Sequence, residues 1–343
     1  SDGALTSLQD KSAGNREYVQ EIDNRFVNDL GIGSGSIAVE NAGPVSATLV
    51  ATAGTPLAHK SSITLFRDVD RIEISNQITQ NFSSTRTWGF SFNLSSPEVN
   101  HEEVVAVVRA RLTTAGGHYS PRNARYDWLT MNHFADMRDA TGGVTISNAD
   151  CHFMQIGNSS STFLDTSTPT IHALAGGQVD GPGLGIASQG GDSSFLQRFA
   201  LRTESGAFDS QSAFRFSLEH QNPLLAGRLG NGTPISGTAV SSVSISNPKI
   251  LLWAMKPAED GLEGQIVLRL MNTSSSAEQA TIQFPSTELL SVSNATHIET
   301  ETSTIPVANN EFDASLAPQE IRTYVIKLKS IPRLNATNLR PYP

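Results

Sequence analysis

The chain has 343 residues, of which 38% are hydrophobic and 17% charged, with a net charge of -9 and one cysteine, Cys151. A chain of this size can bury a sizeable core, and we expect two domains. The acidic balance argues against nucleic acid as a partner, because phosphate binding needs a basic face. A single cysteine cannot form an internal disulfide, so packing alone must hold the fold.

The first third of the chain is a series of short segments with the period-two alternation of β-strands. Residues 71–80 are the clearest case, since every second side chain from Ile72 to Ile78 is apolar or asparagine and those between are polar. Helical periodicity is scarce in this part of the chain. We therefore predict an antiparallel all-β domain. The predicted strands are 36–40, 45–53, 61–66, 71–80, 86–92 and 103–112.

Residues 114–134, which we call the polar–aromatic segment, bring histidines, arginines and large aromatic side chains together. A further strand is predicted at 145–156. A glycine-rich stretch, 174–191, then follows, typical either of a turn-dense connection or of the rim of a site.

Residues 195–226 read as an antiparallel hairpin. The first strand alternates phenylalanine and leucine with arginine and alanine, the second repeats the alternation, and glycine, aspartate and serine between them supply a turn. In the register that pairs both faces sensibly, Phe199 faces Leu218 and Arg198 faces Glu219.

After Pro223 the sequence becomes rich in glycine and polar residues, which predicts a linker or interdomain loop, and we place the domain boundary near Thr238. Turns and short strands then resume, as expected for a small β-sandwich. The predicted strands are 249–256, 265–271, 280–284 and 321–328. The domains are therefore predicted as 1–238, 239–329 and a proline-rich, extended tail, 330–343.

No apolar run approaches the roughly 20 residues that a membrane helix needs, so no membrane partner is expected. The first residues show neither an initiator methionine nor a signal pattern, which favours an excised fragment of a longer protein. A soluble chain, either cytoplasmic or secreted, fits these features.

Several of these stretches resemble the C-terminal β region of family 38 glycoside hydrolases, which are α-mannosidases. The resemblance rests on FLQRFALRTESGAFDSQSAFRFSLEHQNPLLA at 195–226, on DGALTSLQDKSAGNREYV at 2–19, and on GPVSATLVATAG and SSITLFRDVDRIEISNQI, which follow in the family's order. It implies a large galactose-mutarotase-like supersandwich followed by a small β-sandwich. These motifs are structural more than catalytic.

The resemblance implies that the catalytic machinery lies elsewhere. Family 38 enzymes use two carboxyl groups and a zinc ion held by His and Asp side chains, and these belong to the family's N-terminal domain. This chain shows no such ligand set. Its nearest approach is His133 and Asp136, which have helical spacing. We therefore expect no catalytic residue, metal or cofactor here, zinc in the missing catalytic domain, and no activity of the isolated chain.

The chain can still contribute to a sugar site, because the family's β region packs on the catalytic domain and closes its pocket. The candidates are Tyr126, Asp127 and Trp128, which can stack on or hydrogen-bond a sugar, and Arg198 and Arg202, which share a strand face. Core packing and domain contact explain the same residues and are the more usual roles of such side chains, since Trp and Tyr are mostly buried and Glu219 is a sufficient partner for the arginines. The expected partners are the catalytic domain of the same protein and mannose-containing glycans, and self-association stays open.

Two other functions compete with this interpretation. The supersandwich is shared with aldose mutarotases, which use a Glu base and a His acid. Glu219 and His220 are neighbours on a predicted strand and would point to opposite faces, so a second histidine, His118 or His172, is needed. A carbohydrate-binding or assembly module without any reaction is the third possibility.

Overall fold

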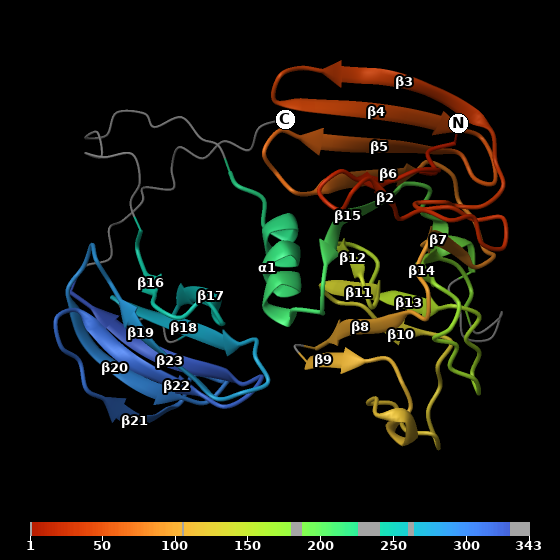
Figure 1. The fold of residues 1–343 in the computed structure, drawn as a ribbon. Helices are drawn as coiled ribbons and strands as arrows, with labels where there is room; N and C mark the ends of the chain where they lie inside the picture. Colours follow the sequence, from red (N-terminus) through yellow and green to blue (C-terminus); the bar gives the residue numbers. More distant parts are fainter. Residues whose placement is uncertain (1, 105, 180–186, 226–240, 260–263, 330–343) are drawn as a thin grey trace. The chain divides into compact units, whose positions relative to one another are not determined.

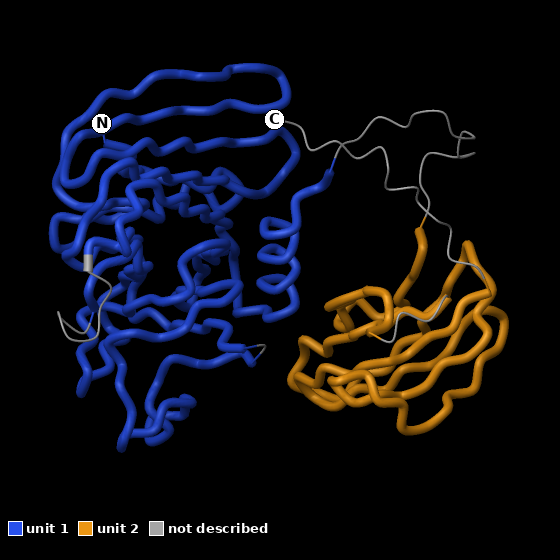
Figure 2. The backbone as a smooth tube through the Cα atoms, turned by 180° about the vertical axis from the view of Figure 1, so that it is seen from behind, with its two compact units in different colours: residues 1–225 blue, residues 226–343 orange. Residues whose placement is uncertain are grey.

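The computed structural model describes residues 2–104, 106–179, 187–225, 241–259 and 264–329. The chain divides into two compact units, residues 1–225 and 226–343, and each has its own hydrophobic core (Figure 2). The predicted boundary at Thr238 lies outside the described residues, so the domain limits stay a prediction.

Two main sheets form unit 1. The nine-stranded sheet, here the large sheet, has the order β3-β4-β5-β6-β15-β12-β11-β8-β9, and the four-stranded small sheet has the order β10-β13-β14-β7. The large-sheet strands are β3 (Gly35–Ala42), β4 (Ser46–Ala53), β5 (His59–Phe66), β6 (Ile72–Ile78), β8 (Glu98–Glu103), β9 (Ala106–Arg109), β11 (Phe134–Asp139), β12 (Gly142–Asn148) and β15 (Phe195–Ser205). The small-sheet strands are β7 (Arg86–Ser91), β10 (Leu129–Thr130), β13 (Phe153–Ile156) and β14 (Thr170–Gly176), and the remaining elements are β1 (Gln9–Asp10), β2 (Arg16–Glu17), the 3-10 turns at Thr113–Ala115 and Ala187–Gly191, and helix α1 (Ser210–Gln221).

The core of unit 1 contains side chains of both sheets. On β6 the predicted alternation is confirmed, since Ile74, Asn76 and Ile78 are buried and Gln77 is exposed. Trp88 of the small sheet is fully buried, and its indole Nε1 donates to Gln197 Oε1 of the large sheet at 2.6 Å. Every second side chain of these strands faces the core, and burial of the apolar ones holds the two sheets together.

The prediction of a second strand in the hairpin is wrong, because the chain forms helix α1 in its place. Asp209 caps the helix by accepting the backbone N–H of Gln211 at 3.0 Å. Burial falls on Ala213, Phe214, Phe216 and Ser217, a helical stripe that packs on β12 and β11 (Figure 1).

The predicted hairpin register is wrong for the same reason. Strand β15 pairs with β6 and β12 instead, so that Phe199 lies between Ile74 and Asn148. The spacing of His133 and Asp136 is not helical either, since β11 begins at Phe134.

Two predicted strands are each divided. Predicted strand 103–112 is the end of β8 plus β9, which pair as a hairpin with Val104 in the left-handed region at φ 44°. Predicted strand 145–156 is β12 plus β13, which belong to different sheets. Of the glycine-rich stretch, residues 180–186 lie outside the described part.

Unit 2 is a small β-sandwich, and its predicted strands are present. A three-stranded sheet, β16-β19-β22, faces a five-stranded sheet, β17-β18-β23-β20-β21, across a core that includes Leu268, Ile282, Phe312 and Ile326. The strands are β16 (Ser244–Ile245), β17 (Ile250–Pro257), β18 (Gln265–Asn272), β19 (Glu278–Gln283), β20 (Leu289–Ala295), β21 (Glu301–Ile305), β22 (Glu311–Leu316) and β23 (Ile321–Leu328).

The predicted all-β class, a large β unit followed by a small sandwich, is confirmed, with α1 as the α-helix of the described residues. None of the helices in the described ranges is long and apolar enough to cross a membrane.

Candidate functional site

The polar–aromatic segment is anchored to strand β8 through its tyrosines. The hydroxyl of Tyr119 donates to Glu103 Oε1 at 2.7 Å and lies 3.0 Å from His101 Nε2, and the two rings stack. His101 Nδ1 donates to the carbonyl of Thr130 at 2.7 Å. Burial lowers the pKa of His101 and raises that of Tyr119, so both side chains stay neutral near pH 7. These contacts fix Tyr119 and His101 between β8 and Thr130 of β10.

The three sugar-contact candidates of this segment differ in exposure. Tyr126 is only 4% exposed, packs edge-on against Tyr119, and donates its hydroxyl to the carbonyl of Ser120. Asp127 pairs with Arg125 at 2.6 Å, and the hydrogen bond from Arg125 lowers the pKa of Asp127. Trp128 is half-buried. Trp128 and Asp127 therefore offer more surface to a ligand than Tyr126 does, and their roles stay predictions.

The two arginine candidates share a face of β15, but each is paired with a carboxylate. Arg198 donates from Nε and Nη2 to the two carboxylate oxygens of Asp150, both at 2.9 Å. Arg202 pairs with Glu204 at 2.5 Å and lies over the ring of Phe216 of helix α1. Glu219, the expected partner, is in neither pair. Because α1 packs beside Arg202, Arg198 is the more accessible of the two arginines.

The family resemblance implies a zinc site of His and Asp ligands in a separate catalytic domain. The candidate ligands His133 and Asp136 of this chain do not form a second such site. His133 Nδ1 lies 2.8 Å from Glu102 Oε2, while Asp136 is buried in a double hydrogen bond with Arg138. Nowhere in the described ranges do three His, Cys, Asp or Glu side chains gather as metal ligands would. The expectation of no metal in this chain stays a prediction.

The residues that a mutarotase mechanism would need lie on separate elements. His220 is on α1, with Nδ1 2.9 Å from Ser147 Oγ of β12, and burial lowers its pKa to about 4. His172 is on β14 of the small sheet, and burial also lowers its pKa to about 4. His118 is exposed and accepts the backbone N–H of Arg109. Within the described residues, His118, His172 and His220 therefore lie on three separate segments.

A feature that the sequence did not reveal is an apolar face on strands β3 to β5. Directly paired residues of antiparallel strands share a face, and the pairs Val39–Leu49, Leu49–Ile63, Ile63–Ile74 and Ile74–Phe199 make one row across the large sheet. Phe199 is fully buried at one end of the row, whereas Leu49 and Val39 are 46% and 65% exposed at the other. The face that is core at β6 and β15 is thus uncovered at β3 and β4.

We define the apolar face as Ile37, Val39, Leu49 and Leu65, each of which is roughly half exposed or more. A hollow of about 790 Å³ lies against it, closed on another side by N-terminal residues that include Leu5 and Leu8. Soluble proteins rarely leave a contiguous apolar patch open unless something binds there. The sequence does show the alternation of apolar and polar residues on β3 and β4, as it does on β6. Alternation alone does not show which of these strands has its apolar face covered.

Comparison with known proteins places the chain structurally. Residues 249–324 match the model of the glycosyl hydrolases family 38 C-terminal beta sandwich domain. A family 38 glycosyl hydrolase from Enterococcus faecalis is similar at a TM-score of 0.68 and 13% identity, over 94% of this chain and 42% of that chain. An alpha-mannosidase from Enterococcus faecalis V583 gives a TM-score of 0.69 and 13% identity, over 95% of this chain and 40% of that one. No curated protein matches.

The chain spans about two fifths of the length of these two structures. The predicted resemblance is confirmed: unit 2 matches the C-terminal β-sandwich of family 38 glycoside hydrolases, and the chain as a whole has the fold of a β region found in two proteins of that kind.

Proposed function

We propose that this chain is the non-catalytic C-terminal β region of an α-mannosidase-type glycoside hydrolase, and that the apolar face of unit 1 docks the catalytic domain of the same protein. The observation that carries the proposal is the row from Phe199 to Val39, along which core packing gives way to exposed apolar side chains.

The extent of the similar structures supports this assignment. Each extends well beyond the part that this chain matches, so a protein of that kind supplies a further domain large enough to cover the apolar face. Covering half-exposed valine and leucine side chains stabilises a contact by roughly 25 cal/mol per Å² of apolar surface. Strand β3 is also the exposed edge of the large sheet, and its unpaired backbone groups are open to hydrogen bonds from a docked domain.

The activity of the complete protein tests the assignment. We expect the full product of the parent gene to hydrolyse an aryl α-mannoside and to lose that activity with a zinc chelator, since zinc and the two carboxyl groups would lie in the catalytic domain. The isolated chain should show no turnover. A complete protein without α-mannosidase activity, or turnover by this chain alone, contradicts the proposal.

A matched pair of substitutions tests the docking surface. Val39→Asp places a charge on the apolar face, whereas Ile298→Asp makes the same kind of change at an 85% exposed site of unit 2. In the complete protein we expect Val39→Asp to lower the melting temperature and the activity together, because a buried unpaired charge is costly. In the isolated chain both variants should melt like the wild type. Equal behaviour of the two variants in the complete protein would remove the docking claim.

A further inference from the structure

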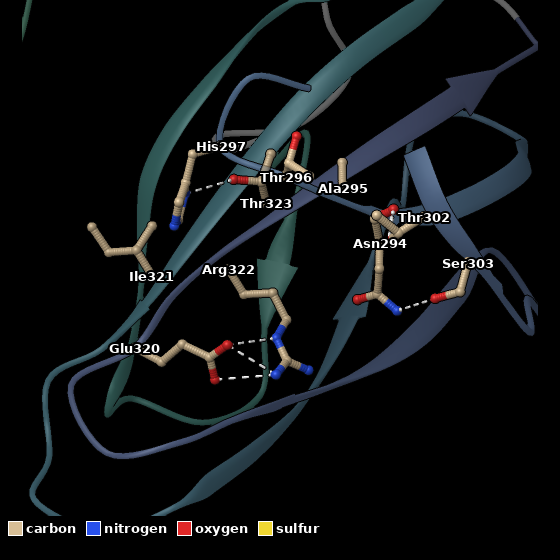
Figure 3. A pocket seen from close by; sticks show the side chains of 10 residues that line it. All are labelled: Asn294, Ala295, Thr296, His297, Thr302, Ser303, Glu320, Ile321, Arg322 and Thr323. Atoms are coloured by element: carbon tan, nitrogen blue, oxygen red, sulfur yellow. Dashed lines mark hydrogen bonds and ion pairs between the residues drawn. The ribbon is translucent and has the colours of Figure 1, made fainter. Parts of the chain in front are cut away.

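Unit 2 carries a polar hollow of about 540 Å³ at one end of its five-stranded sheet (Figure 3). It is open to solvent and is lined by the end of β20, the turn after it, the first residues of β21 and the start of β23. Its lining is Asn294, Ala295, Thr296, His297, Thr302, Ser303, Glu320, Ile321, Arg322 and Thr323. Most of these side chains offer a hydroxyl, amide or charged group, and Ile321 is the one large aliphatic side chain among them.

The β20–β21 turn, which forms one wall of the hollow, is held in place by contacts with residues of β17, β18 and the segment after β17. Glu299, at φ 68°, accepts Lys256 Nζ at 2.6 Å and the backbone N–H of Glu259 at 3.0 Å. Arg269 Nη2 donates to the carbonyl of His297 at 2.9 Å. The turn is therefore tied to β17 and β18 as well as to its own strands. A wall fixed in this way costs little conformational entropy when a ligand binds.

Hydrogen bonds within the lining orient the polar groups of the hollow and still leave donors and acceptors for a ligand. Arg322 donates from Nε and Nη2 to Glu320 at 2.9 and 3.2 Å, and its third nitrogen, Nη1, takes part in neither of these bonds. Asn294 Nδ2 donates to Ser303 Oγ at 3.1 Å, which leaves the amide oxygen to accept. Figure 3 shows the guanidinium of Arg322 between Glu320 and the Asn294–Ser303 pair. Donors and acceptors thus alternate along the wall.

The charges and side-chain types of the lining indicate which class of ligand the hollow could bind. Glu320 and Arg322 neutralise each other, so the hollow does not favour an anion as an isolated arginine would. The lining contains no phenylalanine, tyrosine or tryptophan, and its one aromatic ring is the polar imidazole of His297, which disfavours a flat hydrophobic ligand. A ligand dense in neutral hydroxyl groups, which both donate and accept, matches what remains. The volume lies within the range of small-molecule sites.

We propose that this hollow binds a neutral carbohydrate, with Arg322, Glu320 and Asn294 hydrogen-bonding neighbouring hydroxyl groups of one ring. The proposal is independent of the function assigned above, because the site lies wholly within unit 2 and needs no catalytic domain. Binding should be weak, since the hollow is open and offers no phenylalanine, tyrosine or tryptophan ring for a sugar to stack on.

The test is a titration of the whole 343-residue chain, isotope-labelled and followed by nuclear magnetic resonance, with methyl α-mannoside, methyl α-glucoside and inorganic phosphate as probes. We expect at least one glycoside to shift the side-chain amide signal of Asn294 saturably, and phosphate not to do so. Asn294→Ala and Arg322→Gln should each weaken glycoside binding about tenfold, as loss of a hydrogen bond worth roughly 1.4 kcal/mol would. Lys329→Ala, which removes an exposed ion pair of unit 2, should leave binding unchanged.

Three results would overturn the proposal. They are the absence of saturable binding of either glycoside, a preference for phosphate over both glycosides, and binding that survives both Asn294→Ala and Arg322→Gln. Asn294 is only half-buried, so Asn294→Ala should fold even if Arg322→Gln does not, and that variant alone then decides the matter.

Discussion

Replacing Ser217 of helix α1 by alanine should stabilise the protein. Ser217 is fully buried against the large sheet, and its hydroxyl has no hydrogen-bond partner among the described residues. Leaving a buried hydroxyl unpaired costs about 1–3 kcal/mol, and alanine is the better helix former by a few tenths of a kcal/mol. We take the lower part of that range and expect Ser217→Ala to raise the free energy of unfolding by roughly 1–2 kcal/mol.

For a unit of this size each kcal/mol shifts the melting temperature by about 2–4 °C, so scanning calorimetry should show unit 1 melting about 2–8 °C higher. Arg215→Ala, an exposed position of the same helix, is the control and should change the free energy of unfolding by less than about 0.5 kcal/mol. If residues 214–219 were a strand with Ser217 facing solvent, Ser217→Ala would change almost nothing. A destabilisation of about 1 kcal/mol or more would show instead that the hydroxyl is hydrogen-bonded in the folded protein.

Three further changes probe other parts of the account. Arg138→Leu leaves the buried Asp136 carboxylate unpaired and should lower the free energy of unfolding by about 3–5 kcal/mol, whereas Arg125→Leu at an exposed ion pair should cost about 1 kcal/mol or less; similar losses in a urea titration would contradict this difference. The folded-state pKa of His220, about 4, lies below its unfolded value, so its contribution to stability is complete above pH 6.5 and is lost as the pH falls toward 4. His220→Gln should therefore flatten the decline of the urea midpoint over that interval, and an unchanged slope would count against a buried neutral histidine. Trp128→Ala in the complete protein should lower the melting temperature and leave the Michaelis constant nearly unchanged if the polar–aromatic segment chiefly makes the domain junction, whereas unaltered stability with a several-fold higher Michaelis constant would favour a sugar platform.

The strands that sequence predicted well are those with one buried face. On β6 the alternation from Ile72 to Ile78 is sufficient, because burial repeats with the same period as the side chains. The sequence suggests a strand in place of helix α1 because Phe214 and Phe216 are two residues apart, the spacing of one strand face, whereas on the helix they lie at the two edges of the buried stripe. The signals that favour a helix are local: Asp209 is an N-cap residue, and small residues stand at positions 213 and 217, one helical turn apart.

The candidate site was less predictable than the fold. Asp150, the partner of Arg198, follows β12 and is brought to Arg198 by the pairing of β12 with β15, which spacing along the chain does not reveal. Glu204, the partner of Arg202, lies two residues further along the same strand, so that pair was open to prediction from the sequence. The apolar face could not be recognised either. Val39 and Ile74 sit in equally alternating segments, and only the order of strands in the large sheet shows which of the two is covered.

The central claim is that the apolar face of β3 to β5 is covered in the complete protein. Carbene footprinting of the complete protein and of the isolated chain, read out residue by residue at Val39, Leu49 and Leu65, tests it most directly. Because these side chains are about half exposed or more in this chain, docking should reduce their labelling several-fold. Equal labelling of the three residues in both proteins would contradict the account.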